Sequence, residues 1–401
     1  MGNGRDALLR VRLGIPSHWR EVPIEVNGMN RLLLGLALSC SFLSGSLLAE
    51  TEKIQPLPLG ASAPDFNLPG VDGRNYGLKD FAKAKVLMVA FICNHCPTAQ
   101  AYEERLKKLV VDYQGKGVAL VAISPNDPKS VRLDELGYTD LSDSFEEMKI
   151  RASHKKYNFP YLYDGEQSKV SKLYGPTATP HVFIFDAERK LRYLGRIDDS
   201  EREGFVKVQD ARNALEALLA GNEIKIGKTK TFGCSIKWPG KEETVQRFMA
   251  ALATEPVTVS LADAPALSKL RQNGSGKLRL VNFWATWCGP CITEFPDLVK
   301  INRSFRHRAF ELVTVSANFP DEKKDVLAFL QKNQASNQNL LFADTDKYKS
   351  MAAFDPEWNG ALPYTLLLGP KGEVLYQMQG PIDPLEVKRI IVKSLKEDRF
   401  D

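Results

Sequence analysis

The clearest pattern in the chain is an apolar run of strand length followed by apolar positions at helical spacing. The run covers residues 278–283, and Leu298, Ile301 and Phe305 then recur three or four residues apart. This change of period predicts a buried strand that leads through a short turn into a helix.

The same pattern occurs earlier in the chain. Residues 89–96 align with residues 281–288 without a gap, and Cys96 takes the place of Cys288. The alignment also pairs apolar helix positions, Leu106 with Leu298 and Leu109 with Ile301. An internal repeat of this length predicts two copies of one fold.

Both halves also close in the same way, with a strand opened by proline, a second strand and an amphipathic helix. In the first half, the strands are expected at residues 179–185 and from residue 191, and the helix at roughly 205–220. In the second half, the strands are expected at residues 362–368 and from residue 374, and the helix at roughly 384–396. Each half therefore has the order strand, helix, strand, helix, two strands, helix. Alternating strands and helices predict a parallel core, and the short closing turn predicts an antiparallel hairpin beside it. The expected class is α/β, with two tandem folds that each have a mixed central sheet flanked by helices.

The length of 401 residues has room for two such domains. The pattern breaks after Trp238, so we expect one domain at residues 56–238, a linker at 239–253 and a second domain at 254–401. The second domain should open with a strand at residues 257–259. Proline cannot donate to a sheet ladder, so Pro180 and Pro363 should mark strand starts, and we predict that both are cis.

The first 49 residues have the features of a targeting segment. A short positive region, an apolar core and small residues predict a secretory signal at residues 29–49, which makes residues 1–28 a misassigned extension ahead of a true start at Met29. The alternative is a real tail before an uncleaved signal that anchors the chain in a membrane through residues 32–48. The sequence does not favour a lipid anchor at Cys40, because the apolar residue expected three positions before such a cysteine is lacking. The expected location is exported, either periplasmic or otherwise extracytoplasmic.

Composition and charge exclude some partners. The formal net charge of +5 is small for this length, and basic residues do not alternate with aromatic ones, so we expect no nucleic-acid binding. No nicotinamide or flavin fingerprint is visible, so no cofactor is expected and electrons would have to come from a membrane or envelope thiol reductant. The oligomeric state is left open.

The chemistry of the chain is concentrated in its cysteines. Cys288 and Cys291 stand three residues apart, with Gly and Pro between them and Trp287 in front, at the predicted strand-to-helix turn. Backbone N–H groups and the helix dipole stabilise a thiolate there, so one cysteine can attack a disulfide and the other can resolve it. A zinc site would need two more ligands at suitable spacing, which do not follow. A static structural disulfide is the other alternative.

The run 283–296, together with Pro363, gives the second domain a resemblance to the thioredoxin-like thiol–disulfide reductases of the bacterial envelope, including the cytochrome c maturation type. This resemblance implies that Cys288 is the nucleophile, Cys291 the resolving thiol and Pro363 a substrate-docking residue. It also implies that Glu294 tunes the thiols or relays a proton. The alternative for Glu294 is a carboxylate that favours the first turn of a helix.

The first domain is similar to the peroxiredoxin-like (AhpC/TSA, redoxin) branch of the thioredoxin family. The matching pieces are residues 63–68, 93–98, 178–181 and 233–238. The spacing departs from that of peroxiredoxins, because Cys93 stands where they carry a Thr. The resemblance implies a function in antioxidant defence and cell redox homeostasis for this half, and the departure at Cys93 leaves its substrate class open.

The residues around the first cysteine pair also support a redox site. Pro97 fits the first helical position, which makes Cys96 the helix cap and the better nucleophile. No cysteine follows at the position of Cys291, so Cys93 or Cys234 must resolve. His95 could stabilise the thiolate. The alternatives are that His95 is a solvated turn residue and that Cys234 is a small buried residue.

Three functions follow from these residues. The leading hypothesis is an exported thiol–disulfide oxidoreductase that acts on substrate protein disulfides through Cys288 and Cys291, with a second redox site at Cys93 and Cys96. The second is a peroxidase that uses Cys96 and is reduced by its own second domain. The third is a Cu(I) chaperone site made by Cys93, Cys96, His95 and His181, for which the alternative is that His181 is a plain strand residue. No resident metal is expected otherwise.

Overall fold

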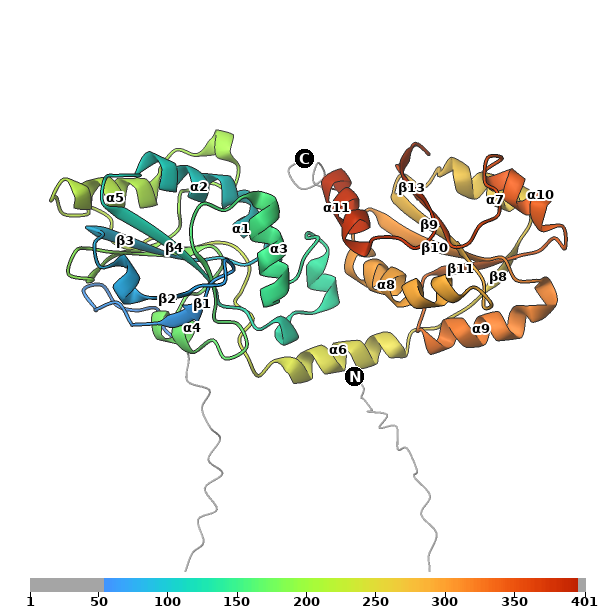
Figure 1. The fold of residues 1–401 in the computed structure, drawn as a ribbon, viewed down its shortest axis with the longest axis horizontal. Helices are drawn as coiled ribbons and strands as arrows, with labels where there is room; N and C mark the ends of the chain where they lie inside the picture. The colour runs from blue at the N-terminus through green and yellow to red at the C-terminus, as the bar shows by residue number, and fades with distance from the viewer. Residues whose placement is uncertain (1–53, 396–401) are drawn as a thin grey trace, which may run out of the picture. The chain divides into compact units, whose positions relative to one another are not determined.

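The computed structural model describes residues 54–395. The predicted extension at residues 1–28, the signal at 29–49 and Cys40 lie outside these described residues. The described chain contains one sheet of five strands, one of six strands and a two-stranded ribbon (Figure 1). Within this part of the chain, no helix is both long and apolar enough to span a membrane.

The first fold is built around the five-stranded sheet. Its elements are β1 (Asn67–Pro69), β2 (Asn75–Gly77), η1 (Leu78–Phe81), β3 (Val86–Phe91), α1 (Pro97–Ala101), α2 (Glu103–Asp112), β4 (Val118–Ser124), η2 (Pro128–Ser130), η3 (Leu133–Leu136), α3 (Phe145–Lys155), β5 (Tyr161–Tyr163), α4 (Lys169–Tyr174), β6 (His181–Phe185), β7 (Leu191–Gly195), η4 (Glu203–Phe205) and α5 (Asp210–Leu219). The strand order is β5-β4-β3-β6-β7. Strands β3, β4 and β5 are parallel, and β6 and β7 are antiparallel.

Alternate residues of β3 face two separate cores. Met88 and Ala90 pack with α2, α3 and α5 on one face of the sheet. Leu87, Val89 and Phe91 pack with α4 and the β1–β2 ribbon on the other face (Figure 1). Because both faces are covered, the strand is apolar at every position, as is typical of a central parallel strand.

The second fold is built around the six-stranded sheet. Helix α6 (Glu242–Ala253) lies in the predicted linker, and the elements of the second fold are β8 (Ser260–Ala262), α7 (Ala264–Gln272), β9 (Leu278–Trp284), α8 (Gly289–Phe305), β10 (Phe310–Ser316), η5 (Pro320–Glu322), α9 (Lys323–Lys332), β11 (Gln338–Phe342), α10 (Lys347–Phe354), β12 (Tyr364–Leu368), β13 (Val374–Gln379) and α11 (Pro384–Leu395). The strand order is β13-β12-β9-β10-β11-β8. The four strands β8 to β11 are parallel, and β12 and β13 form the antiparallel hairpin.

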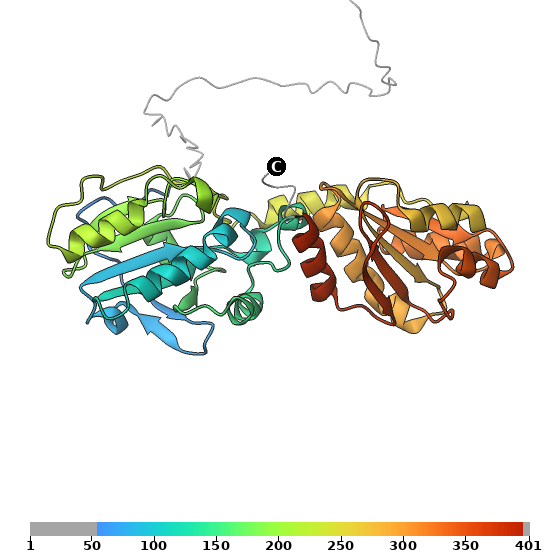
Figure 2. The same ribbon diagram turned by 90° about the horizontal axis from the view of Figure 1, so that it is seen from above.

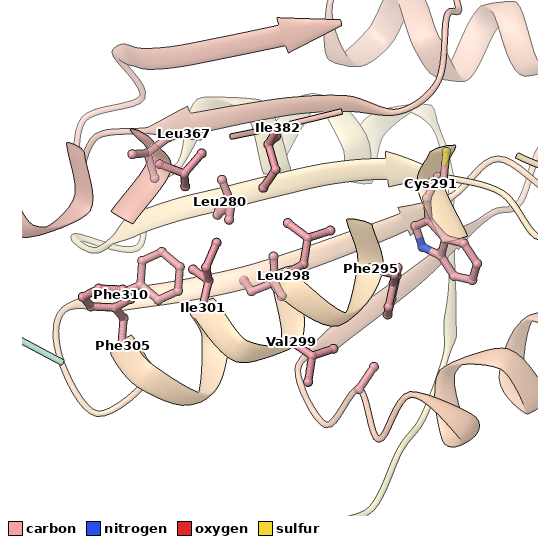
Figure 3. Packing of buried hydrophobic residues seen from close by; sticks show 14 of the residues in the cluster. Leu280, Cys291, Phe295, Leu298, Val299, Ile301, Phe305, Phe310, Leu367 and Ile382 are labelled. Atoms are coloured by element: carbon pink, nitrogen blue, oxygen red, sulfur yellow. The ribbon is translucent and has the colours of Figure 1, made fainter. Parts of the chain in front are cut away.

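Helices cover both faces of this sheet as well. Helices α8, α9 and α11 share one core with Leu280 and Leu367, while α7 and α10 share the other with Phe283. Helices α8 and α11 lie side by side (Figure 2). Figure 3 shows Leu298 and Ile301 of α8 facing the sheet at Leu280.

The predicted fold class is confirmed: the chain has two tandem thioredoxin-like folds, each with a mixed sheet between helices. The structure also has the strand–helix units β5–α4 in the first fold and β11–α10 in the second, which the sequence pattern did not predict. The helix expected from residue 205 begins at Asp210, because residues 203–205 form η4.

The strand predicted at residues 257–259 is wrong by three residues, because β8 covers residues 260–262. The ladder to β11 is made by residues 260–262, and the carbonyl of Thr258 instead accepts a hydrogen bond from the Asn339 side chain. All described residues belong to one compact unit, so the domain boundaries at 238 and 254 stay a prediction. In the described part, however, none of the four hydrophobic cores mixes residues from the two sides of this boundary.

Candidate functional site

The Cys288–Cys291 pair lies where β9 passes into α8. Cys288 is the N-cap of α8, and its Sγ accepts the backbone N–H of Cys291 at 3.3 Å. The two cysteines form a disulfide with their Cα atoms 5.3 Å apart. Cys288 is 6% exposed, whereas Cys291 is fully buried at one end of the hydrophobic cluster (Figure 3). The cysteine nearer the surface is therefore also the one that receives an N–H group of the helix terminus.

The predicted cis proline lies next to this turn. The Leu362–Pro363 bond is cis, which confirms that prediction. Tyr364 pairs with Phe283 in the antiparallel ladder between β12 and β9. Pro363 therefore lies level with the end of β9, directly before the turn that contains Cys288.

Glu294 is buried beneath this site. Its carboxylate accepts hydrogen bonds from the Asn282 side chain and the Ile382 N–H, each at 2.9 Å. Burial raises its pKa in spite of these hydrogen bonds. The alternative of a first-turn carboxylate is wrong, because Glu294 lies beyond the first turn of α8, which contains no acidic residue. Glu294 follows Cys291 by three residues, so the two occupy one helix face.

The surface beside Cys288 carries flat apolar side chains. Trp287 is 62% exposed and Phe319 is also exposed. The Lys347 ammonium lies 3.7 Å from the centre of the Phe319 ring and 5.7 Å from that of Trp287. Partial burial lowers the pKa of this lysine. The rim of the second site can therefore contact apolar parts of a partner.

The first site has the helix cap that the sequence predicted. Cys96 is the N-cap of α1, Pro97 is the first helical residue, and the Cys96 Sγ accepts the Ala99 N–H at 3.4 Å. Cys93 and Cys96 are in the thiol form and almost completely buried.

Thr179 is in contact with all three cysteines of the first fold. Its Oγ1 lies 3.3 Å from the Cys93 Sγ, and its carbonyl accepts the Cys96 thiol at 3.0 Å. Its N–H donates to the carbonyl of Cys234 at 3.0 Å. The Thr179–Pro180 bond is cis, as predicted. The residue before the cis proline thus brings together Cys93, Cys96 and Cys234, which are far apart in the sequence.

His95 is buried and paired with a carboxylate. Its Nδ1 lies 2.5 Å from Asp143 Oδ2 and 3.7 Å from the Cys93 Sγ. Asp143 also accepts the N–H groups of Asn94 and His95 and the side-chain amide of Asn126. The alternative of a solvated His95 is therefore wrong. Sequence reasoning missed Asp143, which belongs to no motif and stands 48 residues away from His95.

The pKa values of the first site are shifted in opposite directions. Burial and the adjacent Cys96 raise the pKa of Cys93 well above its usual range. Burial also opposes ionisation of Cys96, but hydrogen bonds from Cys234, Cys93 and Thr179 outweigh it and lower the pKa of Cys96 well below the usual range. For His95, burial is outweighed by the charge and hydrogen bond of Asp143, so its pKa is raised. This asymmetry favours Cys96 as the nucleophile.

The four residues of the predicted Cu(I) site do not gather as one set. His181 uses its Nδ1 to accept the Thr177 N–H at 3.2 Å, and burial lowers its pKa to about 3. Among residues 54–395, the one group of three or more such residues that could hold a metal ion is Cys93, His95 and Asp143, whose ligand atoms lie within 4.8 Å of one another. This group lacks Cys96 and His181.

Comparison with known proteins gives matches in both halves of the chain. The model of the AhpC/TSA family matches residues 59–194 and 266–377, which together are more than half of the chain.

Individual proteins also match. Thiol:disulfide interchange protein CycY of Rhizobium leguminosarum bv. viciae is 31% identical over 143 residues, which are 36% of this chain and 70% of that protein. Thiol-disulfide oxidoreductase ResA of Bacillus subtilis is 32% identical over 105 residues, and the match spans 26% of this chain and about half (54%) of ResA. A solved structure of an uncharacterized conserved protein from Geobacillus kaustophilus has 40% sequence identity and a TM-score of 0.41, and covers 46% of this chain and 93% of that one.

Proposed function

Because this chain belongs to the AhpC/TSA family and is a thiol–disulfide oxidoreductase, we propose that Cys288 and Cys291 exchange disulfides with substrate proteins. The observation that carries this proposal is the position of Cys288. It caps a 17-residue helix, receives the Cys291 N–H on its sulfur and is joined to Cys291 in a disulfide. A helix N-terminus of this length stabilises a thiolate at its cap.

The proposed reduction of a substrate disulfide has two steps. The Cys288 thiolate attacks one sulfur of the substrate disulfide, and the other sulfur leaves as a thiolate. Cys291 then attacks the Cys288 sulfur and releases the second substrate thiolate, which leaves the Cys288–Cys291 disulfide. The two electrons come from the cysteine pair, and its two protons end on the substrate thiols. Glu294, with its raised pKa, is the group that takes the proton of Cys291 in this proposal.

The Cys93–Cys96 pair is proposed as a second redox site of the same chain. Cys96 serves as its nucleophile, since its sulfur accepts the Ala99 N–H and its pKa is lowered. The same lowered pKa favours a second candidate function for this half, a peroxidase in which peroxide oxidises Cys96 to a sulfenic acid and a neighbouring thiol converts it to a disulfide and water.

The compartment and the electron donor also belong to this proposal. The predicted signal at residues 29–49 favours an exported protein. A membrane or envelope thiol reductant would then restore the dithiols. Fractionation of cells that produce the full chain tests the location, and recovery in the cytoplasmic fraction would contradict it.

One experiment compares the full chain with its Cys288→Ser and Cys96→Ser variants. Insulin reduction with dithiothreitol as the electron source and the consumption of hydrogen peroxide are measured side by side. We expect Cys288→Ser to abolish catalysed insulin reduction and Cys96→Ser to leave most of it. Insulin reduction that survives Cys288→Ser would overturn the proposal. Peroxide consumption that requires Cys96 would establish the second candidate function.

A further inference from the structure

The first cysteine pair is covered more completely than the second. Cys96 is 0% exposed and Cys93 is 3% exposed, while Cys234 lies partly at the surface. In the second fold, Cys288 keeps some exposure and the exposed Trp287 lies beside it. A disulfide of another molecule can therefore approach Cys288 directly, but not Cys96.

The cover of the first site is a segment of this chain itself. The covering segment, residues 233–238, pairs with Thr179 through the carbonyl of Cys234. Further along, the Lys237 N–H donates to Asn126 Oδ1 at 2.9 Å, and the Lys237 carbonyl accepts the Asp127 N–H at 2.8 Å. Hydrogen bonds therefore hold this segment against Thr179, which contacts both thiols, and against residues 126–127.

The fit of the covering segment is close at its first residue. Gly233 has φ +134°, and a Cβ at this position would lie 2.0 Å from the Thr179 carbonyl oxygen. A glycine is therefore required for the segment to approach Thr179. In the second fold the matching position is Leu362, before the cis proline, and within residues 54–395 its N–H donates no hydrogen bond.

Cys234 is placed to react with Cys96. Antiparallel pairing brings its Cα within about 5.5 Å of that of Thr179. The Thr179 carbonyl in turn accepts the Cys96 thiol at 3.0 Å. Cys234 also packs against the hydrophobic core that contains Cys93 and Cys96. The hydrogen bond from Cys234 that lowers the pKa of Cys96 agrees with this proximity.

We propose that Cys234 is the thiol through which the buried Cys93–Cys96 pair exchanges electrons with other molecules. This inference rests on the proposed redox function of that pair. Cys234 is then neither a structural residue nor only a resolving thiol. It is the point of contact between a covered dithiol and its partners.

Three exchange steps connect the outside to the pair. Cys234, as a thiolate, attacks an external disulfide, and one external thiolate leaves. The Cys96 thiolate attacks the Cys234 sulfur and expels the second external thiolate, which forms a Cys96–Cys234 disulfide. Cys93 attacks the Cys96 sulfur and expels the Cys234 thiolate, which leaves a Cys93–Cys96 disulfide. The external disulfide gains two electrons from the pair, and the protons of Cys93 and Cys96 end on the external thiols.

The test uses the full chain with Cys288→Ser/Cys291→Ser as the parent, so that only the first site reacts. The reduced parent and its Cys234→Ser and Cys93→Ser derivatives are mixed with glutathione disulfide. The reaction is stopped with acid at successive times, and the disulfides are mapped by peptide mass spectrometry. Ser235→Ala, next to the proposed exchange thiol, is the matched control, and circular dichroism verifies that each variant is folded.

We expect glutathione to appear first on Cys234. Cys234→Ser should slow the formation of the Cys93–Cys96 disulfide by about tenfold or more, whereas Ser235→Ala should not change it. Cys93→Ser should accumulate the Cys96–Cys234 disulfide. If the Cys234→Ser chain oxidises at the parent's rate, or if glutathione appears first on Cys96, the exchange function of Cys234 is overturned while the redox pair stands. A parent whose pair never oxidises would overturn both.

Discussion

Asp143 is the residue that gives the first site its charge. It is fully buried, accepts hydrogen bonds from two backbone N–H groups and one side-chain amide, and pairs with the Nδ1 of His95. Burial disfavours both charges, but the pair outweighs it, so the pKa of Asp143 is lowered and that of His95 is raised. A cationic imidazolium beside Cys96 favours the thiolate at neutral pH.

Asp143→Asn removes this charge and keeps an acceptor for the backbone N–H groups. Without the carboxylate, burial lowers the pKa of His95, so the imidazole becomes neutral and the pKa of Cys96 rises. We expect alkylation of Cys96 by iodoacetamide at pH 7 to slow by about tenfold. The measurement is the pH dependence of the alkylation rate at Cys96, followed by mass spectrometry. Asp164→Asn, which also replaces a buried aspartate of the first fold, is the control and should leave the rate unchanged.

Asp143→Asn should also lower the free energy of unfolding, by an amount that depends on pH. The raised pKa of His95 means that its protonation stabilises the fold fully below the ordinary value of 6.5, and that this is lost as the pH rises through the raised pKa. The lowered pKa of Asp143 means that its contribution is present above the ordinary value of 3.8 and is lost as the pH falls through the lowered pKa. The loss of free energy of unfolding in Asp143→Asn, about 3 kcal/mol, should therefore be largest between about pH 4 and 6.5. Hydrogen exchange of peptides from residues 86–112 measures it, and a loss independent of pH would contradict the ion pair.

Trp287 belongs to the rim of the second site. It is 62% exposed beside Cys288. A large flat side chain at this place can contact a polypeptide substrate, whereas a small disulfide makes few contacts with it. Trp287→Ala should lower kcat/KM for insulin by about tenfold and change kcat/KM for glutathione disulfide by less than about twofold. Phe205→Ala removes an exposed aromatic of the first fold and should change neither value. Equal losses for the two substrates would assign Trp287 to the chemistry of the thiols instead of to docking.

At the scale of elements, the helices and strands that the sequence predicted are those in which a periodic apolar pattern coincides with a specific residue such as a proline. Pro97 indicated the start of α1 and hence Cys96 as its cap, and the structure confirms both. Strands β5 and β11 were missed because their residues do not stand out from their surroundings. β5 has only three residues, and both strands owe their place to pairing with a neighbouring strand. Strands of this kind depend on tertiary partners that a local pattern does not contain.

The covering segment is an element whose effect can be tested by one added methyl group. Gly233→Ala places a Cβ 2.0 Å from the Thr179 carbonyl oxygen, so residues 233–238 must move away from the thiols. We expect Cys96 to be alkylated about tenfold faster and the Cys96–Cys234 disulfide to form more slowly. Both rates are measured in the full chain with Cys288→Ser/Cys291→Ser.

Gly240 provides a matched control for this element. It also has a positive φ, +93°, but a Cβ there meets no atom within 4 Å. Gly240→Ala therefore carries the same kind of backbone strain without the clash at Thr179. Equal alkylation of Cys96 in the two alanine variants would show that residues 233–238 do not shield the first site.

At the scale of the whole molecule, the two sites differ in how far the sequence predicts them. Cys288, Cys291 and Pro363 are found from a contiguous motif and a strand start, because the local helix turn fixes most of that geometry. The first site is assembled from Cys93, Asp143 and other distant residues, which meet only through the fold. The sequence gives no spacing by which Asp143 could be singled out from other aspartates.

The two folds should unfold independently, because each buries its own two cores and no described core contains residues of both. Leu106 and Leu298 occupy equivalent helix positions in the repeat, and both are fully buried. Leu106→Ala and Leu298→Ala should each lower the free energy of unfolding of their own fold by about 3 kcal/mol. The two substitutions thus serve as each other's control.

Hydrogen exchange of the full chain in increasing urea measures the unfolding of the two folds separately. Peptides of β3–β4 report on the first fold, and peptides of β9–β10 report on the second. Leu106→Ala should shift the urea midpoint of the first set of peptides alone, and Leu298→Ala that of the second set alone. A common shift of both sets in either variant would mean that the chain unfolds as one cooperative unit. In that case the predicted boundary at residues 239–253 separates two sequence repeats but not two domains, and a substitution at one redox site would have to be controlled for its effect on the stability of the other.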